Sequence, residues 1–128
     1  MPTPNFVSKS MVLSIHARQI ERFGGTAGVR DEGLLESALA QPQATFGGQF
    51  LHPIISEQTA AYLYHIAMNH PFIDGNKRTA FAVMDTFLPL NGCALNLTDD
   101  RAYDLVMRVA QGTMTKEELS TEFESCIV

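Results

Sequence analysis

Residues 56–92 read SEQTAAYLYHIAMNHPFIDGNKRTAFAVMDTFLPLNG, in which two largely apolar segments flank the polar stretch HPFIDGNKR at residues 70–78. The first segment predicts a helix over 56–69 with Ser56 as its cap. Its small residues suggest tight packing near the centre of the fold; they are Ala60, Ala61 and Ala67. The second segment predicts a helix over 76–88, which is stopped by Pro89, Asn91 and Gly92.

Four further helices are predicted outside this pair, because apolar residues recur at helical spacing between capping and stop residues. Their expected spans are 8–23, 31–42, 98–111 and 115–127. The buried face of the first of these is expected to carry Val12, His16, Ile20 and Phe23. We expect His16 to be a core histidine, whose ring either bonds a backbone carbonyl near the 70–78 segment or only packs there.

The remaining segments complete an all-α fold. Residues 43–53 (QATFGGQFLHP) lack a helical period and contain glycine and proline, which predicts a loop or a short hairpin. Residues 93–97 are expected to be extended. Thr115 with Glu118 has the pattern of a capping box, ahead of a last helix expected to bear Leu119, Phe123 and Ile127. We therefore expect a compact bundle of about six helices, with the 70–78 segment joining the third and fourth.

The composition is that of one globular domain, expected to span residues 1–128. Nine basic against 14 acidic residues give a net charge of −5, which disfavours general binding to nucleic acid. No apolar run approaches the roughly 18 residues of a membrane span, and the N-terminal segment lacks a signal-peptide pattern, so a cytoplasmic location is expected. Cys93 and Cys126 have no CxxC spacing and are expected to be reduced thiols.

The 70–78 segment concentrates side chains that can bind and transfer phosphate. Pro71 ends the preceding helix, so the imidazole of His70 is presented from a loop and can accept a proton from a hydroxyl. Asp74 can hold Mg²⁺ together with phosphate oxygens. The sequence thus offers a base and a metal ligand within one turn between two helices.

The start of the following helix is expected to bind an anion. Gly75 lets the backbone approach a ligand closely, and free N–H groups of Gly75, Asn76 and Lys77 would point out from the helix start. Lys77 and Arg78 can neutralise phosphate oxygens. An alternative is a polar turn in which Asp74 caps the helix, His70 is a half-buried residue with its hydrogen bonds satisfied, and the cations are solvated.

The stretch resembles the signature of the Fic/Doc family, HxFx(D/E)(G/A)N(G/K)R. The matching residues are His70, Phe72, Asp74, Gly75, Asn76, Lys77 and Arg78. A looser resemblance extends over RFGG at 22–25, GVRDEGLLESAL at 28–39 and FLPLNG at 87–92. The chain looks like the short Doc branch, the death-on-curing toxins of toxin-antitoxin pairs.

The resemblance implies an all-helical fold and assigns roles to these residues. His70 would act as general base toward a protein hydroxyl, Asp74 would bind Mg²⁺, and Phe72 would anchor the loop in the core. The phosphates of ATP would be held by Asn76, Lys77, Arg78 and the backbone of Gly75. The loop containing Phe46 and Phe50 resembles the flap that aligns the target segment in this family.

Two positions bear on which group is transferred. Family members that transfer AMP carry GNGRxxR, whereas this chain has Lys77 at the second glycine and Phe81 at the second arginine. A lysine at this position resembles the pattern of the Doc branch. That resemblance implies transfer of the γ-phosphate of ATP to a threonine of elongation factor Tu, which arrests translation. AMP transfer to a protein hydroxyl is the alternative, and a non-catalytic module acting through an antitoxin is another.

The resemblance also implies control by a second protein. Many Fic enzymes carry an inhibitory helix of the form (S/T)xxxE(G/N), and no string here qualifies, since 28–33 lacks the leading hydroxyl and 120–125 ends in Glu124-Ser125. We therefore expect a small antitoxin whose C-terminal segment folds as a helix beside the active loop. DNA binding is expected in that partner, because this chain is acidic.

Overall fold

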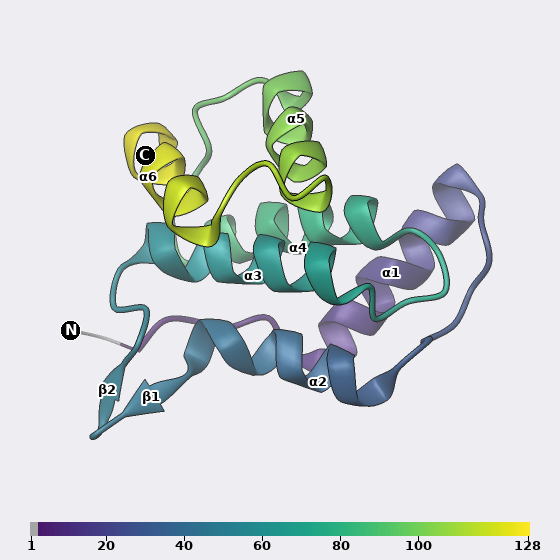
Figure 1. The fold of residues 1–128 in the computed structure, drawn as a ribbon, viewed down its shortest axis with the longest axis horizontal. Helices are drawn as coiled ribbons and strands as arrows, with labels where there is room; N and C mark the ends of the chain where they lie inside the picture. Colours follow the sequence, from purple (N-terminus) through teal and green to yellow (C-terminus); the bar gives the residue numbers. More distant parts are fainter. Residues whose placement is uncertain (1–2) are drawn as a thin grey trace.

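The computed structural model describes residues 3–128, which form six α-helices, a short 3₁₀ helix and one hairpin (Figure 1). The helix α3 lies at the centre, with α2 on one side and α5 and α6 on the other. This arrangement confirms the predicted all-α fold. In chain order the elements are α1 (Lys9–Phe23), α2 (Glu32–Ala40), η1 (Gln41–Gln43), β1 (Thr45–Phe46), β2 (Gln49–Phe50), α3 (Ile55–Asn69), α4 (Asn76–Leu90), α5 (Asp99–Ala110) and α6 (Lys116–Cys126).

Side-chain caps fix the start of four helices, as the sequence predicts. The side chains of Ser8, Asp31, Thr98 and Thr115 each accept a bond from an N–H group in the first turn of α1, α2, α5 and α6. Thr115 and Glu118 form the reciprocal capping box. The cap predicted at Ser56 is wrong, because α3 begins one residue earlier, at Ile55, and Ser56 is buried in its first turn.

The core is built around α3, which confirms its predicted central position. It packs against α2, α4, α5 and α6, and its alanines, Ala60, Ala61 and Ala67, are completely buried. Tyr62 is also buried, and its hydroxyl accepts a bond from the N–H of Val7 at 2.9 Å. Small side chains on one face let the neighbouring helices approach closely, so α3 is a fixed element from which its end loops project.

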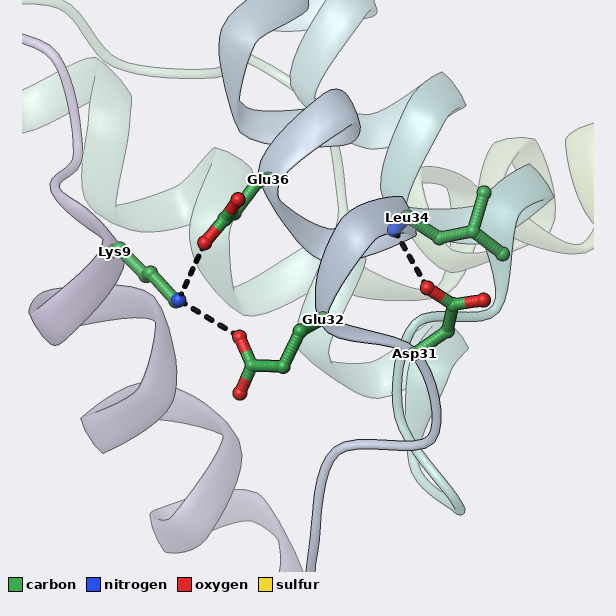
Figure 2. Close-up of polar contacts among 5 residues, drawn as sticks. All are labelled: Lys9, Asp31, Glu32, Leu34 and Glu36. Carbon is green, nitrogen blue, oxygen red and sulfur yellow. Dashed lines mark hydrogen bonds and ion pairs between the residues drawn. The ribbon is translucent and has the colours of Figure 1, made fainter.

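Helices α1 and α2 are tied together by Lys9. Its ammonium lies 2.7 Å from Glu32 and 3.0 Å from Glu36, while Asp31 caps α2 by accepting from the N–H of Leu34 at 3.0 Å (Figure 2). These contacts join the start of α1 to the start of α2, where the connection between the two helices, residues 24–31, ends. That connection runs past the loop between α3 and α4.

Three predicted details are wrong. Phe23, expected on the buried face of its helix, is 57% exposed. It lies in the last turn of α1, where two guanidinium groups lie over its ring. The end of α4 is at Leu90, with Asn91 as its cap and Gly92 after it as predicted, but Pro89 lies inside the last turn and does not stop the helix. Ile127 lies just beyond α6 and forms an antiparallel bridge with Leu95.

The hairpin and the loop that joins α3 to α4 lie at opposite ends of α3 (Figure 1). The two-residue strands β1 and β2 confirm the predicted short hairpin. Within 93–97, Leu95 forms an isolated bridge with Ile127 and Leu97 lies in a bend, so the segment is extended only in part. No helix within residues 3–128 is long and apolar enough to cross a membrane.

Candidate active site

His70 occupies an unusual backbone conformation at the end of α3. Its φ of 47° and ψ of 55° are left-handed, and it is the one non-glycine residue with positive φ among residues 3–128. The chain then turns sharply into Pro71, and the side chain of His70 is exposed. The imidazole is therefore presented to solvent at the mouth of the loop, as the sequence predicts.

The α1–α2 connection clamps this loop from one side. Val29 and Phe72 form an antiparallel bridge, the N–H groups of Arg30 and Asp31 bond to the carbonyl of Pro71 at 2.7 and 3.1 Å, and the N–H of Ile73 bonds to Gly28. The guanidinium of Arg30 also donates to the carbonyls of His70 at 2.7 Å and Asn69 at 3.0 Å. Sequence reasoning assigned no role to Arg30; its signal was only its place in the string GVRDEGLLESAL.

Phe72 and His16 anchor the loop in the core. Phe72 is 1% exposed, and its ring stacks on the imidazole of His16 with centroids 3.8 Å apart and planes 7° apart. His16 is buried and its Nε2 bonds to the carbonyl of Asp74 at 2.8 Å. This contact resolves the two alternatives left open for His16, because the ring both packs and bonds the loop backbone.

Asn76 fastens the loop with both polar atoms of its side chain. Its Oδ1 accepts from the N–H of Phe72 at 2.9 Å, and its Nδ2 donates to the carbonyl of Phe72 at 3.0 Å. The side chain is buried. The part of Asn76 left to meet a phosphate is its backbone N–H.

Asp74 is an exposed carboxylate whose two oxygens each accept a backbone bond. Oδ1 accepts from Gly75 at 2.8 Å and Oδ2 from Thr26 at 3.2 Å. These two bonds lower the pKa of Asp74 below its ordinary value, the bond from Gly75 having the larger effect and the bond from Thr26 the smaller. The carboxylate is therefore readily ionised. Gly25 allows this approach, since a Cβ there would lie 2.7 Å from Oδ2.

The start of α4 exposes backbone donors. It follows Gly75, which has φ 75°, and it has no side-chain cap. The N–H groups of Asn76, Lys77 and Arg78 have no acceptor within residues 3–128, whereas the capping box of α6 satisfies the N–H groups of Thr115 and Glu118. The expectation of a free N–H at Gly75 is wrong, because Asp74 accepts it. The three open donors and two adjacent cations favour an anion here.

A pocket of about 280 Å³ brings most of the predicted site residues together. Phe72 supports the pocket from the core without lining it. Arg78 is braced, since its guanidinium donates to the carbonyl of Gly24 at 3.2 Å and lies 5.4 Å from the ring centroid of Phe23. Tyr103, from α5, is a lining residue that sequence reasoning missed. The full lining is His70, Ile73, Asp74, Gly75, Asn76, Lys77, Arg78 and Tyr103.

The structure does not bring Phe46 and Phe50 to this pocket. Their hairpin lies at the N-terminal end of α3, and the 15 residues of that helix correspond to about 22 Å. Phe50 packs edge-on against Phe6 with centroids 5.8 Å apart, and Phe46 is exposed. In this arrangement α3 separates the hairpin from His70, so the structure does not support a flap over the active loop.

Comparison with known proteins agrees with the motif. The Fic/DOC family model matches residues 6–88, which is more than half of the chain. A protein named Toxin Doc, from Mycolicibacterium smegmatis, is 44% identical over 102 residues that cover 78% of both chains. A protein named Protein kinase doc, from Escherichia phage P1, is 31% identical over 109 residues that cover 85% of both chains. The chain therefore belongs to the Fic/DOC family.

Proposed function

We propose that this chain is the toxin of a toxin-antitoxin pair and transfers the γ-phosphate of ATP to a hydroxyl of a target protein. The observation that carries the proposal is the pocket beside α4, where an exposed imidazole, an ionised carboxylate, three open N–H groups and two cations meet. The names of these two relatives, one a toxin and the other a protein kinase, support the same activity.

His70 would act as the general base. Its imidazole accepts the proton of the attacking hydroxyl while that oxygen forms a bond to the γ-phosphorus and the bond to the bridging oxygen breaks, which releases ADP. The residue suits this task because its side chain is exposed while the carbonyls on both sides of its Cα are fixed by Arg30.

The start of α4 would hold the phosphates. The N–H groups of Asn76, Lys77 and Arg78 point out of a helix without a side-chain cap, and the two basic side chains add charge. Arg78 is restrained by Gly24 and Phe23, so it loses little freedom when it binds an anion.

Asp74 would hold Mg²⁺ together with phosphate oxygens. Residues 3–128 contain no cluster of three His, Cys, Asp or Glu side chains that could hold a metal ion, so phosphate oxygens and water would complete the coordination. One carboxylate with substrate phosphates is an arrangement that Mg²⁺ commonly accepts. The bound ion would supply neutralisation of the charge on the phosphates.

Transfer of phosphate, and not of AMP, is favoured by two positions. Lys77 puts a long cationic side chain where AMP-transferring relatives have glycine. Phe81, at the position of their second arginine, is half-buried and contacts Tyr103 with centroids 6.1 Å apart, so no cation is available there for a triphosphate tail.

Two labelled forms of ATP test this choice. A cell extract is incubated with the protein and ATP labelled on the γ-phosphate or on the adenine, and the modified protein is identified by mass spectrometry. Label from the γ-phosphate on a hydroxyl residue, expected on a threonine of elongation factor Tu, supports the proposal. Label from the adenine supports AMP transfer, and absence of both labels together with no binding of Mg-ATP in calorimetry supports a non-catalytic module.

An antitoxin would bind in the groove next to the pocket. This groove, of about 570 Å³, lies between α1, α4 and α5, and it shares Arg78 and Tyr103 with the pocket. Its lining combines apolar Ile15, Phe23 and Phe81 with charged residues of both signs. An amphipathic helix from the C-terminal segment of a small partner would fit such a surface.

Growth assays test the antitoxin. Expression of this chain alone should arrest growth, and co-expression of the antitoxin, which we expect to be encoded next to it, should rescue growth through a stable complex. Gln19→Trp, which fills the groove, should weaken rescue, whereas Ser14→Trp on the exposed face of the same helix should leave it intact. Normal growth at high expression of the lone folded chain would contradict the toxin proposal.

A further inference from the structure

The end of α3 poses a local problem that Arg30 solves. The last carbonyls of a helix have no partners within it. Here the carbonyls of Asn69 and His70 both accept bonds from one guanidinium, at 3.0 Å from Nη2 and 2.7 Å from Nε. Those two carbonyls belong to the peptide planes on either side of the His70 Cα, so fixing both planes fixes φ and ψ of that residue.

The conformation that these bonds hold is one that His70 would not keep unaided. A left-handed backbone is disfavoured for residues with a Cβ, and the residue before proline is driven toward extended geometry. Relaxation of His70 toward that geometry would turn its Cα–Cβ bond and move the imidazole away from the pocket. The restraint therefore controls where the base lies.

The arginine is itself held in place by main-chain contacts. The backbone N–H of Arg30 donates to the carbonyl of Pro71 at 2.7 Å, next to the Val29–Phe72 bridge. One of its two acceptors, Asn69, is also restrained, because the Nδ2 of Asn69 donates to the carbonyl of Leu34 at 3.1 Å. Arg30 does not line the pocket that contains His70 and Lys77. It contacts the backbone of the base and not the place where the phosphates would bind.

We propose that Arg30 is a positioning residue that holds His70 in its left-handed conformation and thereby aims the imidazole at the acceptor hydroxyl. The catalytic consequence rests on the proposed function, because it takes His70 as the general base. The restraint on the backbone does not depend on that function and can be measured separately.

The test compares Arg30→Gln and Arg30→Lys with the wild-type chain and with Arg101→Gln. Arg101 is an exposed arginine of α5 whose side chain makes no hydrogen bond or ion pair with residues 3–128, so it controls for loss of charge. The first measurement is the ¹³Cα and ¹³Cβ chemical shifts of His70, which report its φ and ψ. The second measurement is the rate at which the γ-phosphate is transferred to the target protein that the labelling experiment identifies in the cell extract, at several ATP concentrations.

In Arg30→Gln we expect the His70 shifts to move toward extended values. The kcat should fall roughly 10²-fold while the KM for ATP changes less than about twofold, as for a misplaced catalytic group with intact substrate binding. Arg30→Lys, which can reach one carbonyl but lacks the planar fork, should give intermediate shifts and rates. Arg101→Gln should match the wild type in both measurements.

Unchanged His70 shifts in a folded Arg30→Gln protein would overturn the proposal. Changed shifts with an unchanged kcat, or a kcat loss matched by an equal rise in KM, would overturn it as well. If Arg30→Gln does not fold, Arg30→Lys carries the same two measurements. A wild-type chain that transfers no phosphate would refute the proposed function alone, because the shifts would still report the restraint.

Discussion

The two loops at the ends of α3 contain similar residues but are held very differently. In the loop over 70–75, the backbone is bonded by side chains of residues between 40 and 58 positions earlier in the sequence. Its aromatic residue, Phe72, is 1% exposed. In the hairpin, the strands are two residues long, Gly47 and Gly48 have open space around them, and Phe46 is 81% exposed.

Composition alone does not distinguish these loops, since residues 43–53, which include the hairpin, and residues 70–75 each contain glycine, proline, histidine and phenylalanine. The difference lies in long-range bonds to the backbone, which hold catalytic groups in position far better than local turns do. Under the proposed function, the 70–75 loop holds a base, a metal ligand and phosphate donors together, and such restraints would serve that task. The hairpin has few of them, and the structure places no catalytic group on it.

The largest difference in activity is expected between variants of two histidines that lie near opposite ends of α3, His70 and His52. His70→Ala should lower kcat by ~10²- to 10⁴-fold, because a general base contributes about that much, and should leave thermal unfolding unchanged since the side chain is exposed. His52→Ala, beyond the hairpin, should retain full transfer. A His70→Ala protein with wild-type kinetics would refute the assigned base.

Phe72→Ala should destabilise the protein by about 3–5 kcal/mol, the usual result of removing a buried phenylalanine. Both the core contact and the stacking on His16 are lost. Chemical denaturation followed by circular dichroism measures the change in free energy of unfolding. A loss below about 1 kcal/mol would mean that Phe72 does not anchor the loop.

Arg78→Ala should weaken ATP binding by roughly 1.5–3 kcal/mol, if a charged hydrogen bond to phosphate is lost. Lys116→Ala is the matched control, because Lys116 is also a cation at the start of a helix, but of α6, which has a capping box and lies outside the pocket. Isothermal titration calorimetry with Mg-ATP should show no change for the control. Equal affinities in both variants would place the phosphates elsewhere.

His65, five residues before His70 on α3, should make stability depend on pH. Burial, with a further effect from Lys116, lowers its pKa from 6.5 to about 4. Between these values the unfolded chain binds more protons than the folded one, so stability should fall as the pH is lowered from about 7 to 4, by at most ~1.4 kcal/mol per pH unit. In His65→Gln, denaturation midpoints should vary less over this range; an identical pH dependence would contradict the assignment.

The smallest effect is expected at the hairpin. Phe46→Ala should change the free energy of unfolding by no more than about 0.5 kcal/mol, because the ring is exposed, and should leave kcat unchanged. Denaturation and transfer assays beside Phe72→Ala measure the contrast directly. A large kcat loss in Phe46→Ala would restore the flap assignment.

Local patterns determined most of what the sequence revealed about this chain. Caps such as Ser8 and Thr115 and the apolar spacing of each helix act within three or four residues, so they can be read without knowledge of the fold. The motif over 70–78 is contiguous, and for that reason the site could be located from the sequence and its family recognised.

Tertiary structure alone decided how that motif is held. Arg30 reaches His70 across 40 residues, Thr26 reaches Asp74 across 48, and His16 reaches Asp74 across 58. No local period encodes such contacts, because they depend on how the α1–α2 connection packs against the loop. Only the structure shows that the side chain of Asn76 is bonded to the backbone of Phe72 and that the length of α3 separates the hairpin from His70.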